Sequence, residues 1–115
     1  MAESLGDWKR THRCADLRAS DIDKEVVLMG WVAKRRDHGG VIFVDLRDRD
    51  GITQVVFRPD IEAEMHERAE SIRNEFVLAI QGRVEARPEG MANPNIPTGE
   101  IDIECYVVRI LDEAE

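Results

Sequence analysis

Apolar and polar residues alternate along much of this chain, with the two-residue period of a β-strand. The clearest case is the segment 41–47, where Ile42, Val44 and Leu46 occupy the even positions. Successive side chains of a strand point to opposite faces, so these three are expected in the core. The same alternation predicts that Phe43 lies on the outer, polar face.

Four further segments have the composition of strands. The apolar run that follows Lys24 predicts a first strand, in which Gly30 indicates a bulge or a tight bend. Residues 100–110 change phase after Val107, which predicts a bulge there. The other two strands are expected at residues 52–57 and 76–86.

One segment between the third and fourth strands has a helical period instead. Its apolar residues at helical spacing are Ile61, Met65, Ala69 and Ile72. We expect a single amphipathic helix that Asp60 caps and that ends near Asn74. The turn sequences His38-Gly39-Gly40 and Asp50-Gly51 separate the first three strands.

Three strands, one helix and two strands predict an all-β fold with one helix. The expected architecture is a five-stranded Greek-key barrel of the OB-fold type, with the helix between strands three and four. A different small barrel is the alternative. We expect residues 1–20 to form a tail with a short helical turn at 16–20. Residues 21–112 should form the barrel, and residues 113–115 should begin a linker.

Charge narrows the range of functions. The formal net charge of −8 argues against a protein that coats nucleic acid non-specifically, because such binding depends on many phosphate contacts. Positive charge is locally dense at the consecutive residues Lys34, Arg35 and Arg36. A local basic patch on an acidic body can still bind one defined RNA.

Other features indicate a soluble, cytoplasmic protein. The chain has no apolar run of membrane-spanning length, and residues 1–10 lack the apolar core of a signal peptide. Cys14 and Cys105 are expected to be reduced thiols. Neither a metal-ligand spacing nor a catalytic constellation is visible, so we expect a domain that binds and carries no catalytic residue.

Three features could bind a ligand. Phe43 on a polar face is suited to stack on a nucleic-acid base, although it could instead lie under a loop. The run Lys34 to Arg36 could contact phosphates or base edges, or could be a solvated surface. Gln54 can both donate to and accept from a base edge, or could be an ordinary rim residue. Trp31 is expected to pack in or near the barrel.

The residues at these positions resemble a known family. Gly30 to Asp48 (GWVAKRRDHGGVIFVDLRD) closely resembles the anticodon-binding domain of bacterial aspartyl-tRNA synthetases. So do Gly51 to Phe57 (GITQVVF), Arg87 to Gly90 (RPEG) and Pro97 to Ile101 (PTGEI). The resemblance covers residues from about Arg13 to Glu115.

This resemblance implies an OB-fold that grips the anticodon loop of aspartate tRNA. It implies that Phe43 stacks on the central anticodon uracil, that Gln54 bonds that base and that Arg36 contacts the anticodon. Asp102 would help to read the first anticodon base, with a shorter reach than the glutamate that is usual in the family. Asn93 would lie in the loop that closes over the anticodon.

Further implications concern specificity and the whole enzyme. Arg35 is a lower-ranked anticodon-binding residue. His38 and Gly90 resemble the branch that also charges asparagine tRNA. A following catalytic domain, absent from this chain, would make aspartyl-adenylate from aspartate and ATP with Mg²⁺, and the whole enzyme would be a homodimer. The alternatives are a stand-alone barrel that binds single-stranded nucleic acid and a barrel used for protein contacts.

Overall fold

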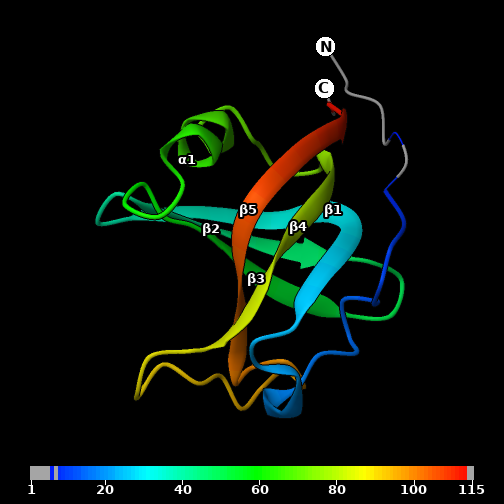
Figure 1. Cartoon of the computed structure of the whole chain (residues 1–115), viewed down its shortest axis with the longest axis vertical. Helices are drawn as coiled ribbons and strands as arrows, with labels where there is room; N and C mark the ends of the chain where they lie inside the picture. Colours follow the sequence, from blue (N-terminus) through cyan, green and yellow to red (C-terminus); the bar gives the residue numbers. More distant parts are fainter. Residues whose placement is uncertain (1–5, 7, 114–115) are drawn as a thin grey trace.

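The computed structural model describes residue 6 and residues 8–113 of the chain. Its elements are η1 (Ala19–Asp21), β1 (Glu25–His38), β2 (Val41–Arg47), β3 (Ile52–Phe57), α1 (Ala63–Ala69), β4 (Val77–Ala86) and β5 (Ile101–Asp112). The strands close into a barrel in the order β1-β2-β3-β5-β4 (Figure 1). All neighbouring strands are antiparallel except β3 and β5. The predicted five-stranded barrel, with its helix between β3 and β4, is confirmed.

The barrel closes because β1 is long enough to serve two neighbours. Its first half pairs with β4 up to Trp31, and its second half pairs with β2 from Trp31 onward. Figure 1 shows β1 curving sharply between these two partners. Gly30 lies at this crossing, where an added Cβ atom would be 2.3 Å from the Arg47 carbonyl oxygen. A glycine is therefore required where the two backbones approach closely.

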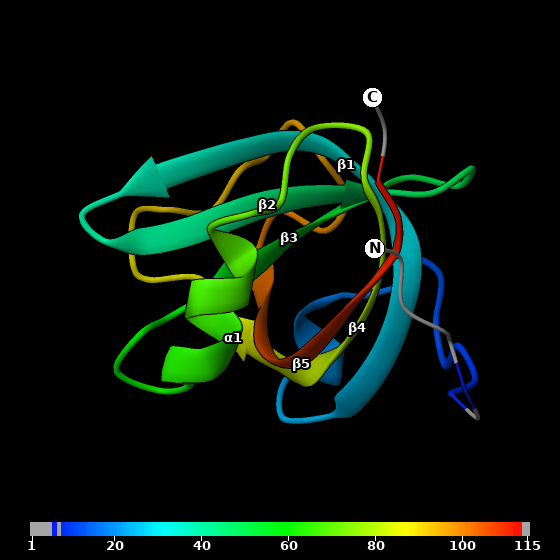
Figure 2. The same ribbon diagram turned by 90° about the horizontal axis from the view of Figure 1, so that it is seen from above.

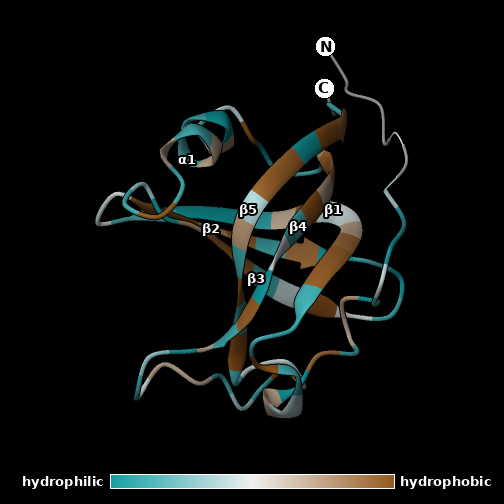
Figure 3. Cartoon of the chain, in the orientation of Figure 1, coloured by the Kyte–Doolittle hydropathy of each residue, from teal (hydrophilic) through white to brown (hydrophobic). Residues whose placement is uncertain are grey.

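The core consists of the side chains that point into the barrel. Ile42, Val44 and Leu46 have no exposed surface, as the alternation predicted, while Phe43 between them is partly exposed on the outer face. Figure 3 shows the same alternation along the strands as bands of hydrophobic and hydrophilic residues. The barrel interior thus holds the apolar residues, and the outer face of β2 is free for polar contacts.

Different segments cover the two ends of the barrel. Helix α1 lies at one end with Met65 and Ala69 buried, and η1 lies at the other (Figures 1 and 2). The N-terminal segment runs along β1, where Thr11 exchanges hydrogen bonds of 2.9 Å with the backbone of Val27. Leu17 further along this segment is completely buried. The part of the tail that the structure describes therefore belongs to the fold.

The β2–β3 loop is fixed by the carboxylate of Asp48. It accepts backbone N–H bonds from Cys14 at 2.8 Å, Asp50 at 2.9 Å and Gly51 at 3.1 Å. Burial alone would raise the pKa of Asp48, but these three bonds outweigh it and hold the pKa below its ordinary value. The loop and the N-terminal segment are thereby tied to each other.

The predicted helix was too long. Glu62 has an extended backbone at the N-cap position and makes no capping bond through its side chain, so the helix starts at Ala63 rather than after Asp60. Ile61 is 49% exposed and lies outside the helix, which ends at Ala69. Ile72 is nevertheless buried, because the turns after the helix fold it onto the barrel.

Other expectations need smaller corrections. The helical turn expected at 16–20 is the 3₁₀ turn at 19–21, and β4 and β5 each begin one residue later than predicted. The bulge in β5 falls at Tyr106, beside the predicted position, since Cys105 and Val107 pair with consecutive residues of β4. Of the linker expected at 113–115, residues 114 and 115 lie outside the described residues, as do residues 1–5 and 7 of the tail.

The indole of Trp31 lies on the outer face of β1 and is 36% exposed. The expectation that it packs in or near the barrel was therefore only partly right. The outward position of Trp31 follows from strand alternation, since Gly30 and Val32 on either side of it are buried. A bulge in β1 follows between Val32 and Lys34. The extra residue returns Lys34 to the same outer face as Trp31, although the two are an odd number of positions apart.

Candidate nucleic-acid interface

A hollow of about 590 Å³ lies on the outer face of the barrel, between the β1–β2 hairpin and the loop at 87–99. A volume of this size is ordinary for a ligand site. Its lining residues are Arg36, Asp37, His38, Phe43, Gln54, Arg58, Arg87, Pro88, Met91, Asn93 and Asp102. They come from four of the strands, from the segment after β3 and from the loop at 87–99, so only the folded barrel brings them together.

One wall of the hollow combines an aromatic ring with a guanidinium. Arg36 and Phe43 are direct partners across the β1–β2 pair. The Arg36 guanidinium carbon lies 5.8 Å from the centre of the Phe43 ring, within the range of a cation–π contact. The hairpin turn that joins their strands has positive φ angles at Gly39 and Gly40 (62° and 84°), which glycine adopts without strain.

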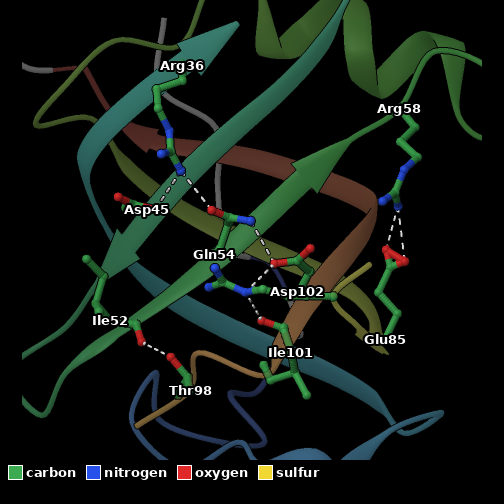
Figure 4. Close-up of polar contacts among 10 residues, drawn as sticks. Arg36, Asp45, Ile52, Gln54, Arg58, Glu85, Thr98, Ile101 and Asp102 are labelled. Carbon is green, nitrogen blue, oxygen red and sulfur yellow. Dashed lines mark hydrogen bonds and ion pairs between the residues drawn. The ribbon is translucent and has the colours of Figure 1, made fainter. Parts of the chain in front are cut away.

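A chain of polar contacts crosses the floor of the hollow (Figure 4). Arg36 lies 3.6 Å from Asp45 and donates to Gln54 Oε1 at 2.7 Å. Gln54 Nε2 in turn donates to Asp102 Oδ1 at 2.7 Å. The same oxygen of Asp102 is 3.1 Å from Arg87 Nε. These contacts fix the amide of Gln54, with its oxygen toward Arg36 and its nitrogen toward Asp102.

Asp102 is the most deeply buried acid of this site, with a side chain that is 3% exposed. Burial raises its pKa, and the charge of Arg87 is the largest effect that opposes the rise. The side-chain contacts of Asp102 with Gln54 and Arg87 meet at Oδ1, as Figure 4 shows. Its Oδ2 atom is therefore available to accept a hydrogen bond from a ligand.

Arg58 at the end of β3 forms a second polar group beside the hollow. It contacts Glu85 Oε1 at 2.5 Å and Oε2 at 3.1 Å, and lies 3.5 Å from Glu104. Burial would lower the pKa of Arg58, but these acids outweigh it and raise the pKa. For the carboxyl of Glu85, burial raises the pKa, and the nearby Arg58 only partly opposes this rise. The cations of the site thus have protein acids as partners.

The loop at 87–99 is anchored at its base. Thr98 donates to the carbonyl of Ile52 at 2.7 Å, and the backbone of Asn93 donates to Gly99 at 2.9 Å. Gly99 admits no side chain, because an added Cβ atom would lie 1.7 Å from the Asn93 carbonyl oxygen. Met91 near the tip is 62% exposed. The anchored base places Asn93 in the wall of the hollow.

The structure brings together six of the seven predicted site residues. These are Arg36, His38, Phe43, Gln54, Asn93 and Asp102. Arg35 does not line the hollow. It points toward the helix and donates from Nε to the carbonyl of Ala69 at 3.4 Å. Its position follows from strand alternation, since its neighbour Arg36 points outward.

Five residues of the hollow were missed from the sequence. Arg58 directly follows β3, and the strand alternation does not identify it, because Val56 between Gln54 and Arg58 is buried. Arg87 and Pro88 begin the proline-rich loop and belong to a string that already resembled the family. Asp37 likewise belongs to the string 30–48 that resembled the family, whereas nothing in the sequence pattern pointed to Met91.

Among the described residues, no group of three or more His, Cys, Asp or Glu could hold a metal ion. No helix in the described part of the chain is long and apolar enough to cross a membrane. Cys14 and Cys105 are buried and free, and burial raises the pKa of both thiols.

Comparison with known proteins identifies the class. Residues 26–111 match the family described as an OB-fold nucleic acid binding domain, and the chain belongs to this family. A solved structure, OBody AM2EP06 bound to hen egg-white lysozyme, superposes with a TM-score of 0.79 at 27% identity. The match covers 92% of this chain and 96% of that one.

Comparison with curated sequences gives a narrower group of relatives. The aspartate–tRNA(Asp/Asn) ligase of Syntrophotalea carbinolica is 55% identical over 115 residues, all of this chain and 19% of that ligase. The ligase of the same description from Nitratidesulfovibrio vulgaris is 62% identical over 111 residues, which are 96% of this chain and 18% of that ligase. This chain therefore spans about a fifth of the length of the ligases that it matches.

Proposed function

We propose that this chain is the part of an aspartate–tRNA ligase that binds the anticodon loop of its tRNA. The observation that carries the proposal is the position of Phe43. Its ring lies on the outer face of β2 within a hollow, beside a cation and a chain of polar groups. Bases stack on such rings, and polar side chains beside them can read base edges.

The polar contacts support the reading of bases over the binding of phosphates. Arg36, Arg58 and Arg87 each lie within ion-pair distance of a carboxylate, and these acids offset the positive charge that would attract a phosphate. Gln54 and Asp102 present a carboxamide and a carboxylate oxygen, which are groups that discriminate between base edges. We propose that Phe43 stacks on the central anticodon base and that Gln54 bonds that base. In the same proposal Arg36 contacts the anticodon and Asp102 reads its first base.

The activity of the whole enzyme is part of the proposal. Its support is the identity of 55–62% to ligases of which this chain spans about a fifth. In such an enzyme aspartate, ATP and Mg²⁺ would bind outside this chain, in a catalytic domain. We also propose a cytoplasmic enzyme that acts as a homodimer.

Acceptance of asparagine tRNA is a finer proposal. Both ligases described above carry a name that includes tRNA(Asp/Asn). His38 lines the hollow, and Gly90 has a positive φ of 82° with open space around it. An open loop beside His38 would leave room for either of the two last anticodon bases.

The test is a binding titration of the 115-residue chain. The ligands are RNA hairpins that differ only in the anticodon: the aspartate anticodon, the asparagine anticodon and a scrambled one. We expect similar affinities for the first two hairpins and weaker binding of the third. Equal affinity for all three would contradict anticodon reading. A strong preference for aspartate over asparagine would contradict only the relaxed specificity.

The same titration separates the alternatives. A stand-alone binder of single strands would bind an unstructured RNA of the same length as tightly as the hairpin. A barrel used for protein contacts would bind none of these RNAs. All titrations are done at one ionic strength, since affinities for nucleic acid depend strongly on salt.

A further inference from the structure

Arg87 lies at the base of the hollow, where β4 has ended and the loop begins. Its side chain is 8% exposed, which is unusual for an arginine. Its Nε atom donates to the carbonyl of Ile101 at 3.1 Å and lies 3.1 Å from Oδ1 of Asp102. The Ile101 carbonyl belongs to the backbone of β5, so the bond to it fixes the Arg87 guanidinium relative to the Asp102 carboxylate.

The neighbouring carboxylate depends on this contact. A buried carboxylate tends to become protonated unless a cation or several hydrogen bonds stabilise its charge. Oδ1 of Asp102 forms an ion pair with Arg87 and accepts a hydrogen bond from Gln54. With this oxygen held in place, Oδ2 is the atom left for a ligand.

The other charged groups near Asp102 have different partners. They are Arg36 on β1, Asp45 on β2, Arg58 just after β3, Glu85 on β4 and Glu104 on β5, with His38 in the same hollow. Arg36 contacts Asp45, and Arg58 contacts Glu85 and Glu104. Among the described residues of the hollow, Arg87 is the cation that forms an ion pair with Asp102.

We propose that Arg87 is a positioning residue, which keeps Asp102 ionised and directs its second oxygen toward a base edge that carries N–H donors. This inference rests on the proposed anticodon-binding function. An ionised carboxylate only accepts hydrogen bonds, whereas a protonated one also donates. Loss of Arg87 would therefore change the pattern that Asp102 presents to a base.

The first test needs no RNA. The titration of the Asp102 carboxyl is followed by ¹³C NMR in the wild-type chain and in the variants Arg87→Gln and Arg87→Lys. We expect the midpoint in Arg87→Gln to rise by about 1–3 pH units, the usual effect of an adjacent opposite charge. Lysine keeps the charge but lacks the Nε–H group, so Arg87→Lys should rise by less. An unchanged midpoint in the folded variants overturns the inference, even if only Arg87→Lys folds.

The second test measures binding of the aspartate hairpin across the same pH range. In Arg87→Gln, affinity should increase as the pH rises through the higher midpoint of Asp102, whereas wild-type affinity should already have levelled off at that pH. In the Asp102→Asn background, Arg87→Gln should add no pH dependence. A loss of affinity that is equal at every pH and persists in that background would show a direct RNA contact or a purely structural role, and would overturn the inference.

The two failures are distinguishable. If the wild-type chain does not prefer the aspartate hairpin over the scrambled one, the proposed function fails whatever the NMR titration shows. If the wild type has that preference but the Asp102 midpoint is the same without Arg87, only the role of Arg87 fails.

Discussion

Replacing Phe43 by alanine removes the ring on which the proposed function depends. The ring is partly exposed, and its recorded ring contact is the one with Arg36, whose guanidinium lies 5.8 Å from its centre. A base stacked on an aromatic side chain contributes about 1–3 kcal/mol. At about 1.4 kcal/mol for each tenfold change, the dissociation constant should rise by about 5-fold to 150-fold.

Two controls separate stacking from other effects of the change. Phe43→Leu keeps most of the apolar volume but has no aromatic face, so its loss of affinity should be close to that of Phe43→Ala. Trp31→Ala removes another exposed aromatic side chain, which is not among the residues that line the hollow. This variant should bind the hairpin as tightly as the wild type does.

The assay is fluorescence anisotropy with a labelled aspartate hairpin at constant ionic strength, together with urea unfolding of each variant. Because Phe43 lies outside the core, its replacement should cost less than the 3–5 kcal/mol or so that is typical of a fully buried phenylalanine. Affinity that is equal in the wild type and in Phe43→Ala would refute the stacking role. An equal loss in Trp31→Ala would show that the effect is not specific to the hollow.

Three further changes test other parts of the account. Arg36→Ala should weaken hairpin binding. The slope of log affinity against log salt should nevertheless change by less than about 0.7, the change expected when one phosphate contact on a single strand is lost. A change of about 0.7 would show instead that Arg36 contacts a phosphate. Gly99→Ala should displace Asn93, because the added Cβ atom would lie 1.7 Å from the Asn93 carbonyl oxygen. Hairpin binding should then weaken at least several-fold. Unchanged binding would show that the anchored loop is not needed for RNA binding. Asp48→Asn should lower the free energy of unfolding by about 2–3 kcal/mol at pH 6, since a charged acceptor of backbone N–H bonds is lost. The control Asp50→Asn removes an exposed ion pair and should lower the free energy of unfolding by less than about 1 kcal/mol. Because folding lowers the pKa of Asp48, its carboxylate stabilises the fold fully above the ordinary pKa of about 3.9, and this stabilisation is lost as the pH falls through the folded value. Urea unfolding should therefore show the loss of stability in Asp48→Asn shrinking below about pH 4. A loss of stability that is independent of pH would contradict this.

The strands could be predicted from the sequence because each has a local pattern. The period of two in 41–47 identified both the core residues and the exposed Phe43. The helix was predicted too long because Ile61 and Ile72 continue its apolar spacing, although both residues lie outside the helix. An apolar spacing cannot distinguish a continued helix from turns that bury the same face.

The site depends on contacts that a sequence pattern does not contain. Gln54 and Asp102 are 48 positions apart, and they meet because β3 pairs in parallel with β5 as the barrel closes. Arg87 reaches Asp102 from a loop whose path is set by its anchors. Resemblance to a family supplied the identity of several site residues, but it also included Arg35, which the fold directs toward the helix.

The central claim is that the anticodon loop binds in the hollow between the β1–β2 hairpin and the loop at 87–99. The most direct measurement is a ¹H–¹⁵N NMR titration of the 115-residue chain with the aspartate hairpin. We predict that the largest chemical-shift changes fall on Arg36, Phe43, Gln54 and Asp102, and that the helix α1 is little affected. Largest changes on α1 or on the N-terminal segment, or no changes at a concentration of hairpin that saturates binding, would contradict the account.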